Sequence, residues 1–287
     1  MKKILVLSLM LGILLVGCKG NDPTENQNVD ATNAASESQE EATTQAGQSL
    51  EDIKKQGYIT MGTSAEYPPY EWHDIDGSKD EIIGVDIEIA KAIADDLGVE
   101  LKIKDMQFDG LLAALNANEM DFVIAGMAAT DKRREAVDFS DPYTSQEQLL
   151  LVRAEDADKY KTIDDLKNIT VGVQLGSTQE IFAKENFEKN GVTVNGLPDN
   201  NNIIMELKNG TFDAVFLSGI PANKFAEMHK ELKVIDIQAP PEDSYSIAIK
   251  KGNAELVEQI NKTLTKLNEN DQVKAWEKEY FELSTDK

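Results

Sequence analysis

Two kinds of hydrophobic pattern alternate along this chain. Short apolar runs bounded by polar or glycine residues, such as residues 122–125 and 214–217, predict buried strands. Longer segments such as 87–97 repeat apolar residues every three or four positions, which predicts helices with one buried face. Because strands and helices alternate with short links, the pattern predicts an α/β fold with mainly parallel sheets.

The elements group into two lobes. We predict a first lobe from residues 49–145 together with 246–287, and a second lobe from residues 146–245. The chain would cross between them near 144–148 and again near 244–246, as a two-stranded hinge. In the first lobe, Asp86 is expected to cap the helix that Gly98 ends.

The first residues have the pattern of an export signal. Lys2 and Lys3 precede an apolar run over 4–16 that is too short to span a bilayer permanently, so we predict a signal peptide over 1–17. The letters LVGC, ending at Cys18, resemble a bacterial lipobox, in which the cysteine after the cleavage site carries a diacylglyceryl group. A buried thiol is the alternative, but the residues that follow are too polar to form a core.

Residues 18–48 are expected to form a stalk. They consist mostly of Asn, Gln, Glu, Thr, Ser and Ala, and almost no large apolar side chains occur among them. Such a segment cannot bury enough surface to offset the entropy lost on ordering, so we predict a flexible tether between lipid and domain.

Composition excludes several classes of function. The 287 residues include 29 Lys and Arg against 52 Asp and Glu, a formal net charge of −23, which argues against binding nucleic acid. The single cysteine allows neither an intramolecular disulfide nor a cluster of thiolates around zinc. His73 and His229 lie far apart without ligand spacing, so neither a metal nor another cofactor is expected.

One stretch has the chemistry of an anion site. After the strand at 122–125 the chain turns through small residues into Thr130 and Asp131, either of which would cap a short helix, so backbone N–H groups gather at the strand end. Arg133 adds a planar set of donors suited to a carboxylate. The alternative is that Arg133 and Arg134 are solvated surface charges, and spacing alone favours that alternative.

Five motifs in register give the chain a family resemblance. They are YPPYEW (67–72), IIGVDIEIAKAIADDLGVELKI (82–103), FDGLLAALNANEMDFVIAGM (108–127), TDKRREAVDFSDPY (130–143) and VGVQLGSTQE (171–180). Together they resemble the extracytoplasmic solute-binding proteins of polar amino-acid ABC transporters. That family includes glutamine-, histidine- and lysine/arginine/ornithine-binding proteins. The resemblance runs from about residue 50 to the C-terminus and implies the two-lobed, type II periplasmic-binding-protein fold.

The resemblance also implies a ligand site. By position, Arg133 would bind the ligand α-carboxylate, and Tyr67 and Phe108 would enclose the ligand side chain. Backbone groups and polar side chains would supply the remaining contacts, namely Gly126, Met127, Ala128, Gln174, Ser177, Thr178 and Gln179.

One position departs from the family pattern. Ser218 stands where family members usually place the carboxylate that pairs with the ligand α-ammonium, and Ser64 stands where basic-amino-acid binders often carry Asp. A buried ammonium without a partner is costly. Either another acid, such as Glu66 or Glu147, takes this role, or the ligand is unusual.

The resemblance implies a lipid-anchored receptor outside the cytoplasm. It would act as a monomer without enzymatic activity, capture a polar amino acid between closing lobes and deliver it to an ABC permease. An enzyme similar to cyclohexadienyl dehydratases on the same scaffold is the alternative, and it would need a proton donor in the cleft. An adhesin or a sensor lobe is a third hypothesis.

Overall fold

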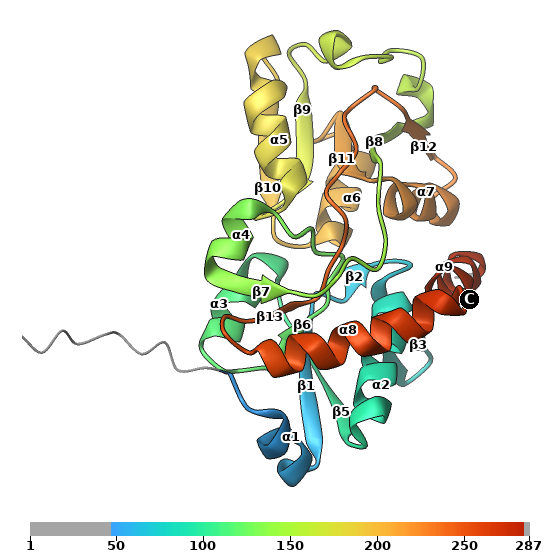
Figure 1. Cartoon of the computed structure of the whole chain (residues 1–287). Helices are drawn as coiled ribbons and strands as arrows, with labels where there is room; N and C mark the ends of the chain where they lie inside the picture. Colours follow the sequence, from blue (N-terminus) through green and yellow to red (C-terminus); the bar gives the residue numbers. More distant parts are fainter. Residues whose placement is uncertain (1–46, 284–287) are drawn as a thin grey trace, which may run out of the picture. The chain divides into compact units, whose positions relative to one another are not determined.

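Two lobes, each built on a five-stranded sheet, make up the folded chain (Figure 1). The computed structural model describes residues 47–283. Lobe 1 contains the sheet with strand order β5-β1-β6-β13-β7, and lobe 2 contains the sheet with order β10-β9-β11-β8-β12. The prediction of a two-lobed α/β fold is therefore confirmed.

The sheet of lobe 1 is mixed. Its strands are β1 (Tyr58–Thr63), β5 (Glu100–Asp105), β6 (Phe122–Val123), β7 (Val137–Phe139) and β13 (Ala248–Lys250). β1 pairs in parallel with β5 and β6, whereas β13 runs antiparallel to β6 and β7. The sequence pattern predicted a mainly parallel sheet, but β13 enters as the chain returns from lobe 2 and so runs in the opposite direction.

The sheet of lobe 2 repeats this arrangement. Its strands are β8 (Gln148–Arg153), β9 (Thr170–Gln174), β10 (Thr193–Leu197), β11 (Ala214–Ser218) and β12 (Leu232–Ile235). β9 pairs in parallel with β10 and β11, and β8 pairs antiparallel with β11 and β12. The carboxyl ends of β9 and β11, at Gln174 and Ser218, supply polar residues to the site described below.

A small third sheet in lobe 1 is built around the turn at Pro68 and Pro69. It consists of β2 (Glu66–Tyr67), β3 (Glu71–Asp76) and β4 (Lys79–Ile83), in antiparallel pairs. Gly77, with φ of 63°, allows the tight turn between β3 and β4.

Helices cover the sheets, and several begin with the side-chain caps that their sequences favour. Thr130, Ser177 and Asp199 each accept a backbone N–H through the side chain at the start of α4, α5 and α6. The helices are α1 (Leu50–Gln56), α2 (Val85–Leu97), α3 (Leu111–Asn116), α4 (Asp131–Ala136), α5 (Thr178–Asn186), α6 (Asn200–Asn209), α7 (Gly219–Met228), α8 (Ala254–Glu269) and α9 (Gln272–Glu282).

Asp86 is not a helix cap, so that prediction is wrong. Gly84 precedes α2, and Asp86 lies inside its first turn with none of its surface exposed. Asp86 instead accepts hydrogen bonds from the Gly126 N–H (2.9 Å) and the Tyr143 hydroxyl (3.1 Å). The carboxylate thus fixes the loop after β6, where the ligand site begins.

The core of lobe 1 follows the predicted helix faces. Ile89, Ile93 and Leu97 of α2 and Ile260 and Leu264 of α8 belong to one buried cluster. Each such side chain stabilises the fold by about 1.5–3 kcal/mol through removal of apolar surface from water. This packing keeps the strand ends of lobe 1 in place.

The chain crosses between the lobes twice, from β7 to β8 and from β12 to β13 (Figure 1). The two crossing segments are joined by backbone hydrogen bonds. The Tyr245 N–H donates to the Thr144 carbonyl (2.9 Å), and the Tyr143 N–H donates to the Tyr245 carbonyl (3.0 Å). These bonds make a two-stranded connection between the sheets.

The C-terminal helix also joins the lobes. α9 packs on α2 and α8 of lobe 1. Lys224, on α7 of lobe 2 and 1% exposed, donates to the Phe281 carbonyl (2.6 Å) and the Leu283 carbonyl (3.0 Å) at the end of α9. A buried ammonium therefore satisfies carbonyl groups at the helix C-terminus.

Candidate functional site

The lobes meet at a narrow cleft between the strand ends. Its free volume is only about 10 Å³, so the walls from the two lobes lie close together. The residues that line the cleft are Tyr67, Phe108, Ala125, Gly126, Ala128, Arg133, Gln174, Ser177, Thr178, Gln179 and Glu242.

Arg133 spans the cleft from lobe 1. Its Nη1 donates to the Ala128 carbonyl (2.7 Å), and its Nη2 donates to the Gly176 carbonyl of lobe 2 (3.1 Å). The guanidinium carbon lies 5.4 Å from the centre of the Phe108 ring. Burial lowers the pKa of the guanidinium, and Glu242 acts in the opposite direction. Arg133 is therefore a cation inside the cleft and not a solvated surface charge.

The N-terminus of α5 forms the opposite wall. The Ser177 hydroxyl accepts from the Glu180 N–H (3.0 Å) and so caps the helix, and Thr178 is its first residue. Backbone N–H groups at a helix start favour negative charge. Arg133 and this helix start therefore provide donors for an anion from both lobes.

Glu242 provides the negative charge of the cleft. It lies in the segment that crosses from β12 to β13. The Thr178 hydroxyl donates to its Oε1 (2.6 Å), and the Ser218 hydroxyl donates to its Oε2 (2.5 Å). Burial raises the pKa of Glu242, while these hydroxyl donors and Arg133 lower it. Sequence reasoning missed this residue because it lies in a proline-rich link without periodicity.

Ser218 lies behind Glu242. It is fully buried and also accepts hydrogen bonds from the Tyr245 hydroxyl (2.5 Å) and from Gln179 Nε2 (3.1 Å). Since its own hydroxyl donates to Glu242, Ser218 orients this carboxylate.

The aromatic residues bound the cleft on the side of lobe 1. Tyr67 and Phe108 are each 7% exposed. A Cβ at Gly126 would lie 3.1 Å from the Tyr67 ring, and the φ of Gly126 is 52°. Glycine is therefore required for the backbone to approach Tyr67 this closely.

Glu66 lies beside the cleft in an adjoining cavity. Gln174 Nε2, which lines the cleft, donates to Glu66 Oε1 (3.3 Å) across the lobes. Glu66 is also hydrogen-bonded to the carboxyl group of Asp199. Burial, followed by the interaction with Asp199, raises the pKa of Glu66 to about 8.

Several predicted residues lie away from the cleft surface. Met127 is buried, and its carbonyl accepts from the Ser246 N–H. Glu147 is exposed, next to the start of α7. Cys18, the predicted lipidation site, lies outside the described residues, as do the predicted signal peptide and most of the predicted stalk.

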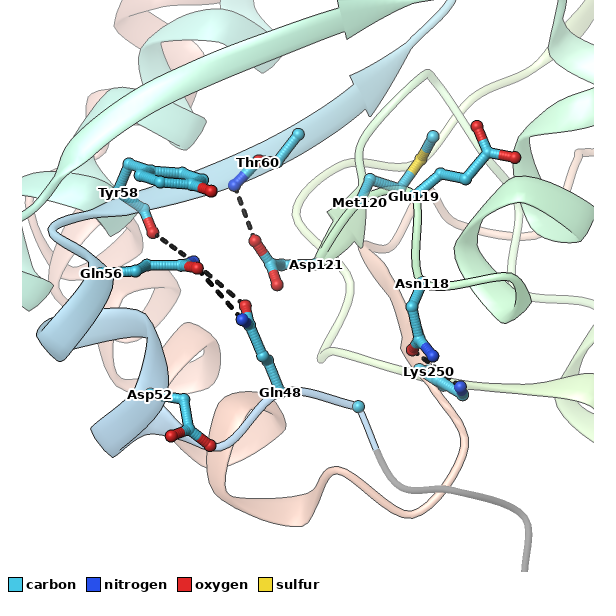
Figure 2. Close-up of a pocket in the computed structure, with 11 residues that line it drawn as sticks. Gln48, Asp52, Gln56, Tyr58, Thr60, Asn118, Glu119, Met120, Asp121 and Lys250 are labelled. Carbon is cyan, nitrogen blue, oxygen red and sulfur yellow. Dashed lines mark hydrogen bonds between the residues drawn. The ribbon is translucent and has the colours of Figure 1, made fainter.

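A larger polar cavity of about 490 Å³ lies beside α1 in lobe 1 (Figure 2). Its polar groups bind one another. Gln48 and Gln56 exchange two hydrogen bonds of 3.0 Å, and the Thr60 N–H donates to Asp121 (2.8 Å). Size alone therefore does not identify the ligand site, whereas the cleft brings together charges of opposite sign.

Residues 47–283 contain neither a candidate metal-binding cluster nor a candidate membrane-spanning helix. Within this range, no group of three or more His, Cys, Asp or Glu side chains is placed to hold a metal ion. In the same range, no helix is both long and apolar enough to cross a membrane.

Two mixed α/β lobes, joined by two crossings around a cleft, define a type II periplasmic binding protein. Residues 59–283 match the model of the bacterial extracellular solute-binding proteins, family 3. The chain belongs to this family, and this membership places the folded domain outside the cytoplasm.

Relatives with known ligands cover most of the chain. ArtP, an arginine-binding extracellular protein of Bacillus subtilis, is 33% identical over 225 residues, 78% of this chain and 86% of ArtP. TcyJ, an L-cystine-binding protein of Escherichia coli, is 29% identical over 232 residues, 81% of this chain and 85% of TcyJ. The fold is similar to the crystal structure of AbpA from Streptococcus pneumoniae, with a TM-score of 0.79 and 36% sequence identity. AbpA is an amino acid ABC transporter substrate-binding protein, and its structure was solved bound to L-arginine. That match covers 83% of this chain and all of AbpA.

Proposed function

We propose that this protein is the substrate-binding component of an amino-acid ABC importer. The observation that carries the proposal is the pair of opposite charges in one cleft, Arg133 and Glu242. An α-amino acid presents a carboxylate and an ammonium on one carbon, so this pair matches the common part of every such ligand. The named relatives bind amino acids, which supports the same conclusion.

Each group of the cleft has a role in this proposal. Arg133 and the backbone of Ala128 and Thr178 bind the α-carboxylate, with Ser177 holding the helix start. Glu242 binds the α-ammonium, and Ser218 orients it. Tyr67 and Phe108 enclose the side chain, and the polar surface is completed by Gly126, Gln174 and Gln179.

Ligand binding is coupled to closure of the lobes. Lobe 1 comprises residues 49–145 and 246–287, and lobe 2 comprises residues 146–245. Arg133 lies on lobe 1, whereas Glu242 is bonded to Thr178 and Ser218 of lobe 2. A ligand that contacts both has a higher affinity for the closed state and shifts the equilibrium toward it. The permease would then receive the closed, loaded form.

Thermal unfolding of the detergent-solubilised protein, measured with each common amino acid in turn, tests this proposal. We expect one or a few amino acids to raise the melting temperature, because ligand at 100 times its Kd stabilises the folded state by about 2.7 kcal/mol. The bound amino acid should be recovered chemically unchanged, in contrast to the dehydratase alternative. N-acetylated and decarboxylated forms of the same amino acid serve as controls. The proposal is wrong if no amino acid shifts the transition, or if the controls bind equally well.

The N-terminus would anchor the protein to the membrane through lipid on Cys18. We expect Cys18→Ala to move the protein from the detergent phase to the aqueous phase in a phase-partition experiment, because lipid acyl chains supply the membrane affinity. Ser36→Ala, in the same predicted stalk, should remain in the detergent phase. Equal partitioning of all three proteins would contradict the lipid anchor.

A further inference from the structure

Two carboxyl groups from opposite lobes meet next to the cleft. Glu66 begins β2 of lobe 1, and Asp199 caps α6 of lobe 2. The two carboxyl groups are hydrogen-bonded to each other. They line a cavity of about 250 Å³ together with Asp105, His73 and Asn201. The volume of this cavity far exceeds that of the cleft itself.

In the part of the chain that the structure describes, no basic side chain balances this pair. Within residues 47–283, no lysine or arginine forms an ion pair with Glu66 or Asp199. His73 lies in the same cavity, but its ring nitrogens contact Asp80 (2.7 Å) and Asp105 (3.2 Å). Two carboxyl groups held in contact cannot both ionise without a cation, so the pair is complete only with a proton or a positively charged ligand group.

An unsatisfied polar side chain lies beside the pair. Asn200 follows Asp199, is 1% exposed, and has no hydrogen-bond partner for either Oδ1 or Nδ2. Its backbone N–H donates to Glu66. This backbone contact places the start of α6 next to Glu66.

The pair is continuous with the amino-acid cleft. Gln174 lines the cleft and donates to Glu66, and Tyr67 of the cleft wall is the next residue after Glu66. A ligand side chain that leaves the α-carbon between Tyr67 and Phe108 would reach Gln174 and then the carboxyl pair. Aromatic faces attract cations, and a guanidinium stacks on them readily.

We propose that the ligand is an α-amino acid with a long, positively charged side chain, whose cation binds between Glu66 and Asp199. The proposal rests on the function proposed above and narrows its substrate class. The carboxyl pair occupies a different place from the position of Ser64, where an acid would be expected for a basic ligand. The positive group of the ligand replaces the proton that the two carboxyl groups share. A neutral amino acid supplies no such cation, so it binds more weakly.

The protonation of the carboxyl groups of Glu66 and Asp199 provides a second measurable quantity, the number of protons released on ligand binding. Because the pKa of Glu66 is raised to about 8, the carboxyl pair shares a proton at neutral pH. Other titratable groups lie near it, namely Asp105, His73 and Glu71, and burial raises the pKa of Glu71 so that its neutral form is favoured. A bound cation lowers the pKa of Glu66, so a proton is released. Affinity for a cationic ligand should therefore rise with pH between about pH 6 and pH 8.

Titration calorimetry with arginine and citrulline tests the proposal, because citrulline is nearly isosteric with arginine but neutral. We expect arginine to bind at least about tenfold more tightly, and to release about one proton per ligand at pH 7 in buffers of different ionisation enthalpy. Glu66→Gln and Asp199→Asn should each weaken arginine binding by about tenfold to a hundredfold, change citrulline binding by less than about threefold, and abolish proton release. Asp199→Asn keeps a residue that caps helices well.

Asp95→Asn is the matched control, since Asp95 is exposed on α2, and it should leave all three quantities unchanged. Equal affinity for arginine and citrulline would overturn the proposal, as would unchanged arginine affinity in both folded variants. In those cases the binding of a neutral amino acid would leave the proposed function intact. Failure to bind any amino acid would overturn the proposed function as well.

Discussion

Replacing Arg133 with alanine is expected to weaken amino-acid binding by at least about a hundredfold while the protein remains folded. Removing one partner of a buried, hydrogen-bonded charge pair costs about 2–5 kcal/mol, and 1.4 kcal/mol is tenfold in affinity. Arg133 also donates to the Gly176 carbonyl across the lobes, so the variant loses a contact that favours closure. Titration calorimetry would measure the affinity, and circular dichroism would establish folding.

Arg134 provides the matched control for Arg133. It is the next residue on α4, is exposed, and its guanidinium lies over Phe139, outside the cleft lining. Arg134→Ala should change affinity by less than about threefold. Arg133→Lys should recover part of the lost affinity, because lysine keeps the charge but not the two-pronged geometry. Unchanged affinity in Arg133→Ala would show that the carboxylate binds elsewhere.

Glu242→Gln is expected to weaken amino-acid binding by about thirtyfold or more, because the α-ammonium loses its charged partner. Glutamine keeps the size of the side chain but has only one acceptor oxygen, so it retains one of the two bonds from Thr178 and Ser218, and the loss reports the charge together with one hydrogen bond. Burial raises the pKa of Glu242, and protonation removes its charge. Affinity in the unmodified protein should therefore fall as pH is lowered through that raised pKa.

The controls for Glu242 distinguish it from other acids. Asp243→Asn alters the neighbouring exposed carboxylate and should leave affinity unchanged. Glu147→Gln tests an acid that sequence reasoning proposed for the same role. If Glu147→Gln weakened binding and Glu242→Gln did not, the ammonium would be bound by Glu147, and the role assigned to Glu242 would be wrong.

The sequence predicted those parts of the site that lie next to periodic elements. Arg133 follows a buried strand and a capped helix start, which the pattern predicts, but only the family resemblance assigned it to the ligand site. Ser177 and Thr178 begin α5 in the same way. These residues depend on local structure, which the pattern of apolar and capping residues encodes.

Glu242 depends instead on where the chain crosses between lobes. Its neighbours in space, Thr178 and Ser218, precede it by 64 and 24 residues, and no periodicity links them. Asp86 illustrates the same limitation, because its sequence position suggests a helix cap while tertiary structure gives it Gly126 and Tyr143 as partners. The surroundings of both residues became visible only through long-range hydrogen bonds, and these partners cannot be deduced from a single sequence.

The junction of Lys224 with the end of α9 has a consequence for the design of biosensors. A fluorescent protein fused directly after Leu283 would be joined next to the carbonyl groups that bind Lys224 of lobe 2. Movement of the lobes would therefore change the position of the fused protein. The fused protein would also pull on the hydrogen bonds between Lys224 and the end of α9. The turn between β3 and β4 is different: Gly77 is needed there for its positive φ of 63°, but the neighbouring Ser78 is exposed. A small dye attached at that turn would mark lobe 1 without pulling on the junction.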